Sequence, residues 1–328
     1  MKQHFQQIDI LKGLAIVAVI LLHSLSKQEL MQSFAVFHIW QAVPVFMVIM
    51  GFNLGLSYGS AALKLRLLYT AHYFQKKALR ILFPLLLIYG IALIVGYVWQ
   101  QVYGEDVYTL GWVNFIGVLP VSGKGNYFIT LLLQSVLVLP FIGYTFHQRP
   151  YLTTVMLVAL EVAFLLVSYQ IEYFSEDRYL YDAAFFRYLS AIALGLWLAK
   201  LASGEKPGLK WVLIVLGMAS AVYLYFHQYQ GITLHNIRPE WQAQLALTFP
   251  YASLLVYLSI LIFPQQSESK LLVSIAHIGK ASYHIFLVQV LFFGLIFKGF
   301  PVMANLSICL LVGYIFYKLE SKLSKKIF

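Results

Sequence analysis

Apolar residues run along this chain in long stretches, which charged residues, glycine and proline interrupt. About 20 apolar residues are enough to cross a bilayer as a helix. We expect helical spans near residues 8–27, 36–58, 81–100, 127–146, 151–170, 183–200, 210–227, 243–263, 277–297 and 302–319. The pattern therefore predicts an all-α, polytopic integral membrane protein with about ten transmembrane helices.

Composition agrees with this pattern, because 61% of the 328 residues are hydrophobic and only 11% are charged. Water-soluble domains do not have such a composition. The segments between the spans are too short to fold alone, so residues 1–328 are predicted to form a single membrane domain. The first apolar stretch has no small-residue cleavage site, and we interpret it as a retained helix rather than a signal peptide.

The net charge of +10 raises the question of a nucleic-acid partner. The basic residues are dispersed among apolar runs and form no basic face, so we expect membrane lipids and no nucleic acid as partners. With a cytoplasmic N-terminus, 17 of the 23 Lys and Arg residues fall on the cytoplasmic side. An even number of spans then places both termini in the cytoplasm.

Three ionisable residues lie on one face of the first span, namely Asp9, Lys12 and His23. At 100° per residue, Lys12 and His23 point within about 20° of each other and Asp9 within about 60° of Lys12. Such groups are costly in a membrane and mark candidate functional sites. Two alternatives stay open: Asp9 and Lys12 simply pair at i,i+3, and His23 is a hydrogen-bond partner between helices.

Other polar or irregular segments carry weaker predictions. The loop at 59–80 is the most basic, and its Lys64 and Arg66 are typical of residues that hold topology and touch lipid headgroups. The segment at 101–126 is apolar enough to dip back into the membrane and line a cavity. Glu161 is either a proton-relay residue or a pairing residue. The histidines show no metal spacing, and the single cysteine, Cys309, excludes a disulfide and a cysteine metal site.

Short motifs in a fixed order resemble those of acyltransferase family 3, a family of membrane proteins. The motifs are Asp9-x-x-Lys12-Gly13-x-Ala15 with His23, Pro44-Val-Phe46 leading to Gly51-Phe52, Lys77-Ala-Leu-Arg80-Ile-Leu-Phe-Pro84, Asn126-Tyr127-Phe128 with Gln134 and Pro140, Arg187 with Gly195, and Gly279-Lys-Ala-Ser282-Tyr283-His-Ile-Phe286-Leu287. Lysine stands at 12 and 77 where the family has arginine, Met50 stands where serine is usual, and Gln289 stands where many members have a second histidine. If one helix ran through the last motif, Gly279, Ser282, Phe286 and Gln289 would share a face.

The resemblance implies an enzyme that moves an acyl group, usually acetyl, from acyl-CoA to a hydroxyl of an envelope glycan or lipid-linked saccharide, in the plasma (inner) membrane. Acetyl-CoA or another acyl-CoA would be a co-substrate, and no cofactor or metal would be bound. The roles implied are these: His23 with Asp9 catalytic; Lys12, Lys76, Lys77 and Arg80 on the donor side; Tyr127, Arg187, Ser282 and Tyr283 on the acceptor or oxyanion side.

A transporter or flippase for lipid-linked saccharide is the alternative, because an intramembrane stripe of Asp9, Lys12 and His23 also suits proton-coupled export. Some members of the same family are linked to polysaccharide export. A purely structural membrane scaffold would have no use for these three residues.

Overall fold

Helices lie within all ten predicted spans in the computed structural model, which describes residues 5–58, 64–176, 178–237, 242–295 and 300–327. Those residues form no strand, so the all-α prediction is confirmed for them. Eight helical segments of the described chain are long and apolar enough to cross a membrane. They are α1 (Gln6–Ser24), Ala35–Ser57 with α3 (Ala42–Tyr58), Leu65–Tyr103 with α6 (Phe83–Tyr103), α7 (Tyr127–Gln148), α8 (Pro150–Gln170), Phe185–Ala202 with α11 (Leu189–Ala202), α12 (Leu209–Gln230) and α16 (Val302–Ile327).

The two remaining predicted spans differ from the expectation. The stretch 243–263 contains α13 (Phe249–Ile262), which has 14 residues and is shorter than a full span. The stretch 277–297 is not one helix, because α14 (Lys270–Lys280) and α15 (Ser282–Leu295) meet at an angle of 66°. The predicted common face of Gly279, Ser282, Phe286 and Gln289 on a continuous helix is therefore wrong.

The bend has a physical reason in the sequence of α14. Lys270, His277 and Lys280 are exposed, whereas Ala276 and Gly279 are buried. A helix with one polar and one apolar face is stable along the edge of the bundle, where the polar face remains outside the apolar core. The chain must turn after Lys280 before α15 enters the core.

Glycines set the closest helix contacts. A Cβ on Gly51 of α3 would overlap the carbonyl oxygen of Ile192 in α11, and one on Gly195 of α11 would overlap that of Val48. A Cβ on Gly279 of α14 would likewise overlap the carbonyl oxygen of Asp9 in α1. Small residues at helix interfaces let backbones approach where the surrounding lipid provides no hydrophobic drive for association.

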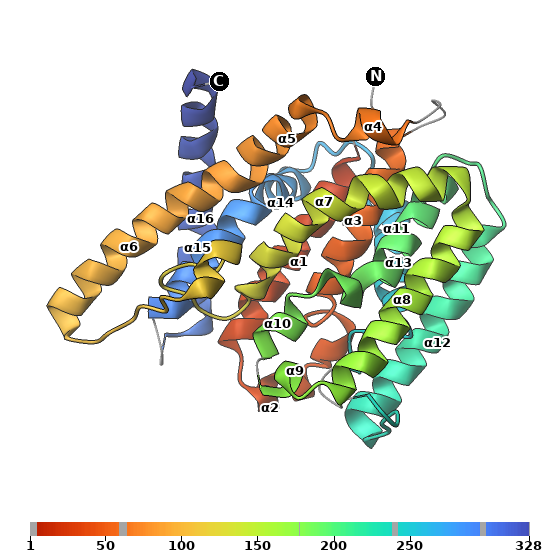
Figure 1. Cartoon of the computed structure of the whole chain (residues 1–328), viewed down its shortest axis with the longest axis horizontal. Coiled ribbons are helices and arrows are strands. Elements are labelled where there is room, and N and C mark those ends of the chain that lie inside the picture. Colours follow the sequence, from red (N-terminus) through yellow and green to blue (C-terminus); the bar gives the residue numbers. More distant parts are fainter. Residues whose placement is uncertain (1–4, 59–63, 177, 238–241, 296–299, 328) are drawn as a thin grey trace.

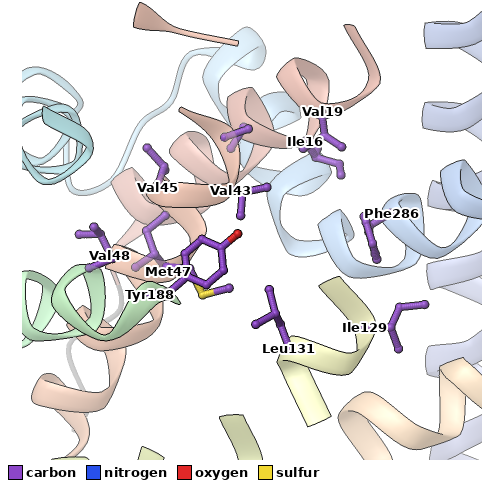
Figure 2. Packing of buried hydrophobic residues seen from close by; sticks show 14 of the residues in the cluster. Ile16, Val19, Val43, Val45, Met47, Val48, Ile129, Leu131, Tyr188 and Phe286 are labelled. Carbon is purple, nitrogen blue, oxygen red and sulfur yellow. The ribbon is translucent and has the colours of Figure 1, made fainter. Parts of the chain in front are cut away.

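The core lies between α1, α3, α7, α11 and α15. Figure 2 shows Ile16 of α1, Met47 of α3, Leu131 of α7 and Phe286 of α15 in this one cluster of buried side chains. The outer helices α6, α8, α12 and α16 instead expose apolar residues such as Ile94, Val155 and Val215. An exposed apolar surface of this extent is suited to contact with lipid.

The last part of the segment between α6 and α7 folds back onto the bundle. It contains η3 (Trp112–Ile116), and residues 118–121 after it are buried. The Gly123 N–H donates to the carbonyl oxygen of Val290 in α15 at 2.9 Å. This returning chain therefore lies against α15 just before α7 begins.

The short helices gather at two opposite edges (Figure 1). At one edge are α4 (Leu65–Leu68), α5 (Ala71–Lys77) and α14, together with the start of α1 and the end of α16. At the other are α2 (Lys27–Gln32), α9 (Tyr173–Glu176) and α10 (Arg178–Asp182). Helix α1 runs from the first edge to the second and so connects them.

Candidate active site

The first part of the candidate site is an ion pair near the start of α1. Lys12 Nζ donates to Asp9 Oδ1 at 3.3 Å, and the two side chains are 19% and 7% exposed. The i,i+3 pairing predicted as one alternative is thus present. Since Asp9 is almost fully enclosed, its ion pair with Lys12 stabilises a carboxylate that is largely removed from water.

A turn of π-helix brings Arg80 toward this pair. The turn η2 spans Ala78–Leu82, and the Phe83 N–H donates to the carbonyl oxygen of Ala78, five residues back. Such turns are rare and often occur at functional sites. The charge of Arg80 acts on both Lys12 and Lys77, so three of the predicted donor-side cations gather here. Lys76 is exposed on the last turn of α5.

Tyr283 supports this turn from the core. Its hydroxyl donates to the carbonyl oxygen of Ile81 at 3.1 Å. Tyr283 and Ser282 begin α15, directly after the bend that follows α14. The resemblance assigns these two residues to the acceptor or oxyanion side, and the structure places Tyr283 against the segment that carries Arg80.

His23 lies in the last turn of α1, 11 residues beyond Lys12 and hence about 16 Å away. Its ring meets that of Phe293 edge-on, with centroids 5.9 Å apart. A Cβ on Gly125 would lie 3.2 Å from His23 Nε2. Among the residues that the structure describes, none hydrogen-bonds the half-buried His23 ring. The alternative in which His23 links two helices by a hydrogen bond therefore has no partner group in that part of the chain.

Tyr127 and Arg187 belong to a second cluster of polar residues. Arg187 Nη1 donates to Asp182 Oδ1 at 2.8 Å, and the guanidinium lies over the rings of Tyr181 and Tyr188, 4.4 and 5.2 Å from their centroids. Burial raises the pKa of the Tyr181 hydroxyl, so this hydroxyl stays neutral. The charge of Arg187 is therefore balanced by Asp182 and not by Tyr181. Tyr127 lies beside Arg187 and Tyr188. Since Tyr127 begins α7 only two residues after Gly125, this cluster adjoins the surroundings of His23.

Two polar residues inside spans hold the Arg187 segment in place. Glu161 of α8 accepts hydrogen bonds at Oε2 from the backbone N–H and the hydroxyl of Ser190, at 2.8 and 2.7 Å. Glu161 thereby caps the start of α11, which is the pairing role that its sequence position left open. Gln134 of α7 donates to the carbonyl oxygen of Ala183 at 2.7 Å and accepts from the Phe185 N–H at 3.1 Å.

A buried pair that the sequence did not indicate joins α15 to α16. His284 Nε2 lies 3.2 Å from Glu320 Oε2, and both side chains are less than 10% exposed. The signal available was a histidine and a glutamate inside two apolar stretches, but nothing in their spacing shows that the two meet. No group of His, Cys, Asp and Glu in the described chain has the arrangement of a metal site.

The comparisons with known proteins bear on this arrangement directly. A family model described as an acyltransferase domain, Acyl_transf_3, matches residues 5–317, nearly the whole chain. The chain belongs to acyltransferase family 3. No curated protein and no solved structure matches it. Together with its apolar helices, family membership makes the protein a multi-pass membrane acyltransferase.

Proposed function

We propose that the protein transfers an acyl group, most simply acetyl, from acyl-CoA to a hydroxyl of an envelope glycan or lipid-linked saccharide at the plasma membrane. The observation that carries the proposal is that α1 has functional groups of two different kinds at its two ends. One end of this helix joins a group of cations, Lys12 with Lys77 and Arg80, and the other end carries an imidazole without a partner among the described residues.

The cationic end suits the donor. Coenzyme A is a polyanion, and cations held close together attract an anion to the space between them. Arg80 and the exposed Lys76 would meet its phosphates first, and Lys12 would interact with groups that enter farther along α1. A guanidinium presents a planar fork to phosphate, whereas the lysines act as point charges.

The imidazole end suits the acceptor. A neutral His23 would take the proton from the acceptor hydroxyl as its oxygen attacks the thioester carbonyl carbon. The new C–O bond forms, the C–S bond breaks, and the coenzyme A thiolate receives the proton back from His23. Arg187 or Tyr127 would stabilise the charge that develops on the carbonyl oxygen.

His23→Ala tests this proposal in purified protein, with radiolabelled acetyl-CoA and an extract of envelope glycans. General-base catalysis contributes about 100-fold or more, so we expect transfer to fall by at least that factor. His38→Ala is the matched control, because His38 is exposed and, among the described residues, its ring bonds the carbonyl oxygen of Ser33 alone. Near-normal transfer by a folded His23→Ala variant would refute His23 as the base.

Saccharide export is the second candidate, favoured by the Asp9–Lys12 pair inside a span. The same preparation distinguishes the two functions when it is reconstituted into liposomes. Movement of labelled lipid-linked saccharide without acyl-CoA, combined with no acyl transfer, would establish the carrier instead of the enzyme.

A further inference from the structure

The turn that precedes α7, residues 122–126, lies beside His23 and is hydrogen-bonded to α15. The Gly123 N–H bonds the carbonyl oxygen of Val290, and Gln289 Nε2 donates to the carbonyl oxygen of Lys124 at 3.1 Å. Gly125 has a φ of +90°, a conformation that favours glycine, and its missing side chain leaves room for the imidazole. Two hydrogen bonds to α15 therefore place the backbone next to Lys124 close to His23 Nε2.

This turn is also electropositive. Lys124 is exposed and forms no ion pair with any described residue, and its charge acts on His23. Immediately after it, α7 begins a run of 22 residues. The start of a helix carries a partial positive charge, and in α7 the Phe128 and Ile129 N–H groups donate to the carbonyl oxygens of Gly125 and Asn126 at 3.1 and 3.2 Å. A lysine and the positive end of a helix therefore lie within three residues of each other along the chain, next to the residues around the proposed base.

Two buried polar groups at the same turn are left without partners. Gln289 is fully buried and its amide nitrogen bonds Lys124, yet no described group donates to its Oε1. The hydroxyl of Ser122 also has no partner there. A buried amide oxygen without a hydrogen bond is energetically costly, and a hydrogen bond from a ligand hydroxyl would remove that cost.

We propose that this turn is a subsite for an anionic acceptor. Lys124 and the start of α7 bind a carboxylate or phosphate of the acceptor saccharide, and Gln289 Oε1 accepts a hydrogen bond from one of its hydroxyls. The subsite rests on the proposed acyl transfer, and it adds that the hydroxyl presented to His23 belongs to a negatively charged saccharide.

Competition tests the subsite without knowledge of the natural acceptor. Acyl transfer to the envelope extract is measured in the presence of methyl glucuronoside, glucose 1-phosphate or neutral methyl glucoside. We expect at least one anionic sugar to inhibit at a concentration about tenfold below that of the neutral one, as a charge-assisted hydrogen bond would produce. Which anion inhibits more strongly distinguishes carboxylate from phosphate as the group bound.

Three variants locate the effect. Lys124→Gln should abolish the preference for the anionic sugars, and Lys124→Arg should retain it. Lys27→Gln should also retain it, because Lys27 is an exposed lysine near the same end of α1 that takes no part in the turn. Equal inhibition by all three sugars would overturn the subsite. A preference that survives in Lys124→Gln would also overturn it, since the anions would then act at the donor-side cations.

The two proposals can fail separately. If the wild-type protein transfers no acyl group to the extract, the proposed function and the subsite are both wrong. If transfer is normal and the three sugars are equivalent, only the subsite is wrong.

Discussion

Lys12 has a structural partner and a proposed ligand, and a pair of substitutions separates the two roles. Lys12→Met should raise the KM for acyl-CoA, but it also removes the ion pair that Lys12 forms with the nearly enclosed Asp9, which should lower the stability by up to about 3–5 kcal/mol. Asp9→Asn combined with Lys12→Met removes both charges and should restore folding. If Lys12 binds the donor, the KM of this double variant stays raised. A return of the KM to its normal value would show that Lys12 serves only to pair Asp9.

Lys12→Arg asks whether the shape of the cation matters. Lys12 makes one bond to one carboxylate oxygen, so a point charge is all that the pair needs. We expect transfer to remain within about fivefold of the wild type, because arginine keeps the single positive charge that the pair uses. A much larger loss would mean that the site is shaped around the lysine side chain.

Some residue contacts could be predicted from the sequence and others could not. The Asp9–Lys12 pair follows from helical spacing alone, because both partners lie on one helix. The Glu161–Ser190 and His284–Glu320 contacts join different helices. They depend on how each helix is rotated against its neighbour, and an apolar stretch that is hydrophobic all round carries little information about that rotation. The sequence shows Gln289 only as a departure from a motif, while its contact with Lys124 depends on the folded-back segment.

At the scale of the helices, the contact between α1 and α14 depends on how closely their two backbones approach each other. Gly279→Ala places a methyl group where the Asp9 carbonyl oxygen lies, so α14 must move away from α1. We expect a loss of about 1–3 kcal/mol, as for other overpacked cores. Gly90→Ala in α6 is the control, since a Cβ there would meet nothing within 4 Å. Removing a helical glycine without a clash should be neutral or stabilising by up to about 1 kcal/mol.

The chain carries its own reporter for this measurement. Cys309 is fully buried in α16 and is the single cysteine of the chain. A thiol-reactive dye should therefore react only as the protein unfolds on heating. Equal unfolding temperatures for the Gly279→Ala and Gly90→Ala variants would show that α14 can shift on α1 without cost.

Most of the helices can be predicted from the sequence, because an apolar stretch of about 20 residues has the length of a membrane-spanning helix. The bend between α14 and α15 was missed, since no proline marks it and Ala281 joins two stretches of good helix-forming sequence. The feature of the sequence that indicates the bend is the polar face of α14, which is formed by Lys270, His277 and Lys280. The π-helical turn around Arg80 was likewise hidden, because its pattern of residues is compatible with an ordinary helix.

For the whole molecule, the decisive question is which edge faces the cytoplasm. The basic residues predict that the edge with the start of α1 does so, and the proposed donor site at Lys12 and Arg80 requires it, because coenzyme A is cytoplasmic. Gln266 precedes α14 at this edge and Gln32 ends α2 at the opposite edge; both side chains are exposed. Each can be replaced by cysteine in a Cys309→Ala background, so that a single thiol reports one side.

A membrane-impermeant maleimide applied to intact cells should label Gln32→Cys and not Gln266→Cys, and permeabilised cells should show both labelled. The two variants control for each other, since each carries one exposed thiol on the same protein. Labelling of Gln266→Cys alone would show that the molecule has the opposite orientation, with the cations on the outer side of the membrane. Coenzyme A would then have no access to Lys12 and Arg80, so the path from those cations along α1 to His23 could not be the path of the acyl group.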